Sequence, residues 1–133
     1  MICVLDACAA IALLRRELGE AVVWAHLSDP KAICFAHAIN LCEIYYDFYR
    51  DTGESAAESA IDDLKALGVV ERNDFDEAFW KEAGKLKAQG KISLADCLAV
   101  TLTNRVGGTL LTSDHHELDA IAAAGICSIT FIR

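Results

Sequence analysis

The chain has 133 residues, a length that fits one domain of ordinary size, and we expect residues 1–133 to form a single domain. Hydrophobic residues make up 54% of the sequence and there is one proline, a composition that excludes a disordered chain and favours dense regular structure. The formal net charge of −8 speaks against a general nucleic-acid-coating protein, which would be basic, but is compatible with a nuclease whose acids bind metal ions.

Short apolar runs that predict buried strands alternate along the chain with segments of helical character. The expected strands are residues 2–5, 32–35, 69–72, 109–112 and 127–132. The expected helices are residues 9–17, 21–27, 38–50, 55–67, 74–89, 93–106 and 118–124. Such alternation is typical of βαβ units, whose right-handed crossovers place helices on both faces of a parallel sheet. We therefore predict an α/β fold of three layers, α/β/α, with a mostly parallel central sheet of four to five strands.

The targeting and cysteine patterns predict a cytoplasmic protein. No apolar run reaches the length of a membrane span, and the N-terminus lacks the positively charged region of a signal peptide. The six cysteines stand at positions 3, 8, 34, 42, 97 and 127, in apolar contexts and without a Cys-x-x-Cys pair. We expect reduced, buried thiols that act as small hydrophobic side chains, in agreement with a reducing compartment.

Two acids lie where strands are expected to end. Asp6 directly follows the first apolar run, and Asp114 lies just past the run at 109–112. Functional sites of open α/β sheets form beyond the carboxyl ends of the strands, which is where these two side chains are expected. Aspartate is also a good helix N-cap, so each acid is equally consistent with capping the helix that follows it.

Two further acids lie on expected helices. Glu43 has Asn40 and Asp47 on the same helical face, so it is either part of an ordinary polar stripe or a buried acid with a function. Asp96 follows Ser93 by three residues, which resembles a capping box. A carboxylate in the first turn of a helix is also kept ionised by the helix dipole, which suits a metal ligand.

Together the four acids predict one site for Mg²⁺ or Mn²⁺, because hard cations prefer oxygen ligands and clustered carboxylates repel one another without a cation. The predicted catalytic and metal-binding residues are Asp6, Glu43, Asp96 and Asp114. Candidates for hydrogen bonds that hold those carboxylates are Asn40, Ser93 and Thr112. The chain has no motif for zinc or for a nucleotide cofactor.

An aspartate phosphotransfer domain is one alternative, because such domains also place an aspartate at the end of the first parallel strand. The Asp6-Ala7-Cys8 segment lacks the second aspartate that a haloacid-dehalogenase-like enzyme needs two residues on. It also lacks the paired acids of a receiver domain after the first strand. This alternative therefore ranks below the metal site.

Four segments of the chain resemble PIN domains and, among them, VapC-type toxins of type II toxin–antitoxin pairs. They are the strand with its first acid at 4–7, the Asn-x-x-Glu helix at 39–43, the helix start at 93–96, and the strand and turn at 110–114. The closing segment 131–133 resembles the last strand of the family, so the resemblance covers nearly the whole chain. Cys8 is a departure, since the family often has serine or threonine near the first acid.

The resemblance implies a metal-dependent endoribonuclease that cleaves single-stranded or structured RNA. Such proteins are usually homodimers and are silenced by a small antitoxin from the same operon. Apolar and aromatic side chains that could serve a dimer or antitoxin surface, or equally the core, are Leu13, Leu14, Val22, Val23, Trp24, Tyr45, Tyr46 and Tyr49. A catalytically inactive PIN-like interaction module is the second alternative. The four acids argue against it, because a domain used only for binding has little reason to keep a repulsive cluster.

Overall fold

The computed structural model describes residues 1–133 and has a five-stranded sheet at its centre. The strands are β1 (Ile2–Leu5), β2 (Ile33–His37), β3 (Val69–Arg72), β4 (Thr109–Thr112) and β5 (Ile129–Phe131). They lie in the order β3-β2-β1-β4-β5, and every pair of neighbours is parallel. The predicted parallel sheet is therefore confirmed, with five strands and no antiparallel member.

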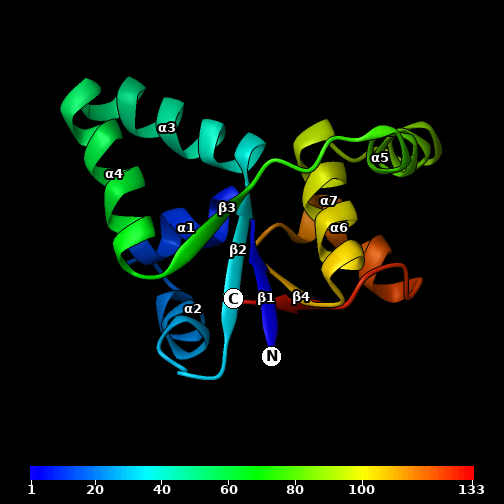
Figure 1. Ribbon diagram of the computed structural model, residues 1–133, viewed down its shortest axis with the longest axis horizontal. Helices are drawn as coiled ribbons and strands as arrows, with labels where there is room; N and C mark the ends of the chain where they lie inside the picture. The colour runs from blue at the N-terminus through cyan, green and yellow to red at the C-terminus, as the bar shows by residue number, and fades with distance from the viewer.

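Helices cover both faces of this sheet, which confirms the predicted three layers (Figure 1). They are α1 (Ala7–Leu14), α2 (Glu20–Leu27), α3 (Ala38–Thr52), α4 (Glu54–Ala66), α5 (Glu77–Gln89), α6 (Leu94–Val106) and α7 (His115–Ala123). One buried core joins the sheet to α1, α2, α3 and α4, and a second joins it to α5, α6 and α7. No helix combines the length and the apolar character needed to cross a membrane.

Side-chain hydrogen bonds decide where several helices begin. The Asp6 carboxylate accepts the Ala9 N–H at 2.9 Å, so α1 starts two residues earlier than the apolar pattern suggests. Asp114 accepts the Glu117 N–H at 3.1 Å, and α7 therefore starts at His115 instead of at residue 118. An N-cap satisfies an amide that the first helical turn leaves without a partner, so it extends a helix beyond its apolar stripe.

The cysteine prediction is wrong for one pair. Cys3 on β1 and Cys34 on β2 are register partners whose Cα atoms lie 4.7 Å apart, and their sulfurs form a disulfide. Neighbouring parallel strands place such partners side by side on one face, a relation that a separation of 31 residues in sequence does not show. The other four cysteines are free, and Cys42 is exposed instead of buried.

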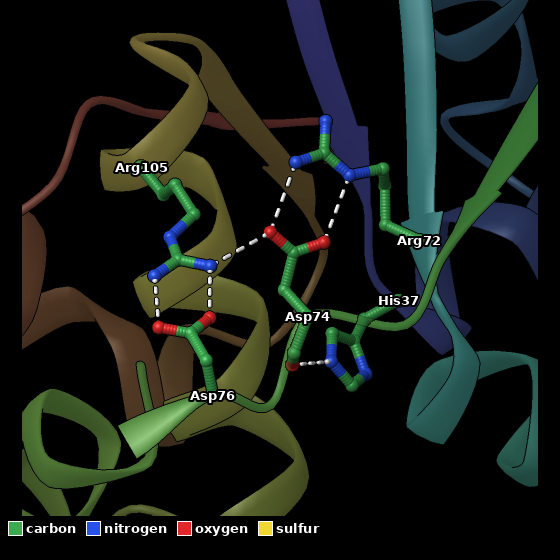
Figure 2. A network of polar contacts seen from close by, with 5 residues as sticks. All are labelled: His37, Arg72, Asp74, Asp76 and Arg105. Carbon is green, nitrogen blue, oxygen red and sulfur yellow. Dashed lines mark hydrogen bonds and ion pairs between the residues drawn. The ribbon is translucent and has the colours of Figure 1, made fainter. Parts of the chain in front are cut away.

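A network of ion pairs holds the connection from β3 to α5 (Figure 2). Asp74 accepts two hydrogen bonds from the Arg72 guanidinium, at 2.8 and 2.9 Å, and a third from Arg105 on α6 at 3.0 Å. Arg105 also forms two hydrogen bonds with Asp76. The His37 Nε2 donates to the Asp74 carbonyl oxygen at 2.8 Å, while its Nδ1 accepts the Ile39 N–H in the first turn of α3. The network therefore joins the start of α3 to α6.

We expect Asp74→Ala to lower the free energy of unfolding by about 1–3 kcal/mol, because it removes the charged acceptor that two arginines share. Asp76→Ala is the matched control and should cost less, since the Asp76 side chain is 55% exposed and the Asp74 side chain only 11%. Urea unfolding at neutral pH measures both. If Asp76→Ala lowered the free energy of unfolding by as much as Asp74→Ala or more, Asp74 would not be the main acceptor of the network.

Candidate metal centre

A cleft of about 370 Å³ opens at the carboxyl end of the sheet. It is lined by residues that follow β1 and β4 and by side chains from the start of α6, from α7 and from α3. The lining residues are Asp6, Ala7, Cys8, Ile11, Glu43, Tyr46, Asp47, Arg50, Ser93, Asp96, Asp114 and Glu117. The structure thus brings all four predicted acids to one cleft, in which six side chains are acidic and one is basic.

The acids at the ends of β1 and β4 are helix caps as well as cleft residues. Asp6 is 2% exposed, and its Oδ1 accepts the Ala9 N–H and the Cys8 thiol, at 2.9 and 3.0 Å. Asp114 accepts the Glu117 N–H through its own Oδ1. In both residues the cap occupies Oδ1 only, so capping and a place in the site are compatible.

Ser93 and Glu117 form the capping arrangement at the start of α6. The Ser93 Oγ accepts the Asp96 N–H at 3.2 Å, as in a capping box. The reciprocal hydrogen bond does not come from Asp96. Instead the Ser93 N–H donates to the Glu117 carboxylate at 3.0 Å. Glu117 therefore takes the second capping role from α7, and the largely buried Asp96 carboxylate is left for the cleft.

Glu117 is a cleft acid that the sequence pattern did not single out. One carboxylate oxygen from each of Asp96, Asp114 and Glu117 lies within 4.8 Å of the others, a spacing at which one cation could bind all three. Glu117 is three residues after Asp114, and so on the same helical face. That spacing is the signal that could have identified it, but it is visible only once α7 is known to begin at His115.

Glu43 reaches the cleft from α3, on the opposite side from α6 and α7. The Asn40 amide, which is fully buried, donates to the Glu43 Oε1 at 2.9 Å and holds that carboxylate in place. Asn40 and Glu43 are one helical turn apart, as the Asn-x-x-Glu spacing predicts. Glu43 and Asp6 line the same cleft. They do not belong to the group of closely spaced carboxylate oxygens, which is formed by Asp96, Asp114 and Glu117.

Thr112 and Cys8 contact the acids and link the ends of β1 and β4. The Thr112 hydroxyl accepts the Asp114 N–H at 3.0 Å and is 3.5 Å from the Cys8 sulfur. The Cys8 sulfur also accepts the Ser113 N–H at 3.4 Å. Burial raises the pKa of Cys8 to about 11, so the thiol stays protonated and donates to Asp6. Cys8 thus makes the contacts of a hydroxyl, although a thiol makes weaker hydrogen bonds.

Burial, together with repulsion between neighbouring carboxylates, raises the pKa of three of the cleft acids. Burial raises the pKa of Asp6 and of Glu43. In Asp96, burial is again the main cause of a raised pKa, and the adjacent Glu117 together with Asp6 and Asp114 adds to it. The hydrogen bond with Asp96 lowers the pKa of Glu117. A cation would replace these protons, and carboxylate oxygens are the donors that Mg²⁺ and Mn²⁺ prefer.

Solved structures with the same fold come from bacterial VapBC pairs. VapBC2 from Rickettsia felis, bound to a DNA fragment from its promoter, matches with a TM-score of 0.76 and 17% identity over 98% of both chains. VapBC-1 from nontypeable Haemophilus influenzae matches with a TM-score of 0.75 and 20% identity over 99% of this chain and 98% of that one. VapC20 from Mycobacterium tuberculosis, described as a toxin that cleaves the sarcin-ricin loop, has a TM-score of 0.67 and 17% identity, with coverage of 92% and 95%.

Similarities at this level of identity show a shared fold. No curated protein matches the chain in sequence. The family model described as PIN domain matches residues 3–124, a span that runs from β1 to just past α7 and includes every acid of the cleft. The chain belongs to the PIN domain family.

Proposed function

We propose that the chain is a metal-dependent endoribonuclease that hydrolyses RNA phosphodiester bonds and serves as the toxin of a type II toxin–antitoxin pair. The observation that carries the proposal is the convergence of five carboxylates, Asp6, Glu43, Asp96, Asp114 and Glu117, in one cleft of a PIN domain. The fold shared with a toxin that cleaves the sarcin-ricin loop supports RNA as the substrate.

The proposed ligands of Mg²⁺ or Mn²⁺ are Asp6, Asp96 and Asp114, to which the geometry adds Glu117. When bound, such an ion neutralises phosphate oxygens and lowers the pKa of a water molecule enough for it to act as a nucleophile. Glu43, oriented by Asn40 from across the cleft, is placed to hold a second ion or to accept a proton from the attacking water. Ser93 and Thr112 fix the backbone that carries Asp96 and Asp114.

The two alternatives predict different behaviour of the same residues. An inactive interaction module would not bind Mn²⁺, so calorimetry without any Mn²⁺ signal would favour it. A phosphotransfer domain needs an accessible aspartate nucleophile, whereas Asp6 is buried and its Oδ1 serves as a cap. Labelling of Asp6 by acetyl phosphate would overturn the nuclease proposal.

In an RNA cleavage assay with Mg²⁺ or Mn²⁺, we expect Asp6→Asn and Asp96→Asn to lose at least about 100-fold in rate, because each removes a metal-binding carboxylate. EDTA should abolish cleavage by the unaltered chain. Asp62→Asn is the matched control, because Asp62 is an exposed acid on α4 that does not line the cleft. Loss of rate in the control as well, or activity that survives EDTA, would contradict the proposal.

The raised pKa of Asp96 makes a second prediction. The folded metal-free chain binds this proton more tightly than the unfolded chain, so its free energy of unfolding should fall as the pH rises above the ordinary aspartate pKa of about 3.9. Asp96→Asn should flatten that slope and remove the stabilisation that added Mn²⁺ gives at neutral pH. Thermal unfolding in EDTA and in Mn²⁺ measures both effects.

A purely structural role of Asp96 as a capping residue predicts the opposite result. In that case Asp96→Asn would lower the free energy of unfolding by roughly 0.5–2 kcal/mol with or without metal. Added Mn²⁺ would still stabilise the variant. Asp62→Asn again serves as the control, because it makes the same chemical change at an exposed site.

We also propose a homodimer and a small antitoxin partner. A hollow of about 660 Å³ between α1, α2 and α4 offers an apolar surface for the antitoxin. It is lined by Leu13, Leu14, Arg16, Glu20, Ala21, Trp24, Asp63, Ala66 and Leu67. Val23, one of the candidate surface residues, is fully buried and belongs to the core instead. Sedimentation of the chain alone tests the dimer.

We expect Trp24→Ala to weaken binding of the antitoxin, encoded by a neighbouring short reading frame, by more than about tenfold, because a large aromatic side chain in an apolar hollow often dominates an interface. RNA cleavage without antitoxin should be unchanged. Trp80→Ala is the matched control, since Trp80 on α5 is 45% exposed and Trp24 is 48% exposed. Weaker binding in Trp80→Ala alone would place the antitoxin elsewhere.

A further inference from the structure

The cleft-facing side of α3 carries more than its acid. Glu43, Tyr46, Asp47 and Arg50 all line the cleft, and their spacings of three, four and seven residues place them on one helical face. Tyr46 is 48% exposed and the Arg50 side chain is 73% exposed, although large aromatic rings are more often buried. Beyond its acids, this helical face therefore presents two exposed groups, the Tyr46 ring and the Arg50 guanidinium.

Arg50 is the one basic residue of a cleft that holds six acids. Its guanidinium hydrogen bonds to Asp47 at 3.2 Å, but Asp47 is already paired with Arg15 at 2.8 Å. Arg50 uses only its Nη2 in this hydrogen bond, and its guanidinium lies 5.6 Å from the centre of the Tyr46 ring. A polyanion that enters this cleft meets the one basic lining residue here, beside the aromatic ring.

We propose that Tyr46 and Arg50 form a platform that selects unpaired RNA: one base stacks on the Tyr46 ring, and an adjacent phosphate lies against the Arg50 guanidinium. The proposal rests on the nuclease function above and names the two residues that would hold an unpaired segment of the RNA. Single-stranded RNA is recognised by stacking of splayed bases on aromatic and guanidinium planes. Bases inside a duplex already stack on both neighbours, so a duplex cannot use an exposed ring in this way.

The neighbouring tyrosines of α3 show that the position of Tyr46 is specific. The Tyr45 hydroxyl donates to Glu58 of α4 at 3.2 Å, and the Tyr49 ring lies against Tyr45 with the ring centres 6.0 Å apart. Neither lines the cleft. Tyr49 is 51% exposed, close to the 48% of Tyr46, so it provides a matched control on the same helix.

The test is fluorescence anisotropy with the full chain, Ca²⁺ in place of Mg²⁺, and a short labelled RNA without self-complementarity. Tyr46→Ala should weaken binding by about tenfold or more, whereas Tyr46→Phe, which keeps the ring, and Tyr49→Ala should change it less than about twofold. Annealing the RNA to its complement should weaken binding and remove the dependence on Tyr46.

Arg50 is tested by the salt dependence of the same binding. Arg50→Ala should lower the slope of log affinity against log salt by about 0.7, the value for one lost contact to a single-stranded phosphate. Lys81→Ala, which removes a charge on α5 outside the cleft, should leave the slope unchanged. An Arg50→Lys variant should retain the slope, because lysine keeps the charge.

The platform is refuted if unaltered protein binds the duplex as well as the single strand or does not bind the single strand. It is also refuted if Tyr46→Ala binds normally, or if Tyr49→Ala loses as much as Tyr46→Ala. Cleavage with Mn²⁺ separates this failure from that of the nuclease proposal. If the protein cleaves RNA but Tyr46→Ala binds RNA as well as the unaltered chain, only the platform proposal is overturned. If Tyr46→Ala weakens RNA binding but the unaltered chain cleaves no RNA, only the nuclease proposal is overturned.

Discussion

The repulsion among carboxylates at the carboxyl end of a parallel sheet is the constraint on which the structure of the cleft depends. Three of the acids are fixed there by hydrogen bonds that begin helices: Asp6 and Asp114 cap α1 and α7, and Glu117 completes the start of α6. The energy of helix capping thus offsets part of the cost of bringing like charges together. A site assembled in this way is complete only when the helices around it are folded.

Much of this arrangement could be predicted from the sequence because it follows from local periodicity. Asp6 and Asp114 end apolar runs, and Asn40 and Glu43 are one helical turn apart, so their placement needs no knowledge of distant contacts. Glu117 escaped prediction because its position depends on where α7 starts. A single hydrogen bond, donated by the Glu117 N–H to the Asp114 carboxylate, sets that boundary. Helical propensity alone does not show such a bond.

Two other features depended on relations between distant segments. The pairing of Cys3 with Cys34 follows from the register of β1 against β2, and strand register is a tertiary property. The start of α5 at Glu77, three residues later than its sequence pattern suggests, follows from ion pairs that hold Asp74 and Asp76 outside the helix. Arg105, which makes those pairs, is about thirty residues away in sequence, and no local pattern joins it to them.

The ion-pair network also has a mechanical consequence for the cleft. His37 caps α3, which carries Glu43, Tyr46 and Arg50, and Arg105 belongs to α6, which carries Asp96. Through Asp74 the start of α3 and the C-terminal part of α6 are joined by hydrogen bonds between residues that do not line the cleft. A substitution in this network would therefore act on how the two helices are held relative to each other while leaving every carboxylate of the cleft unaltered.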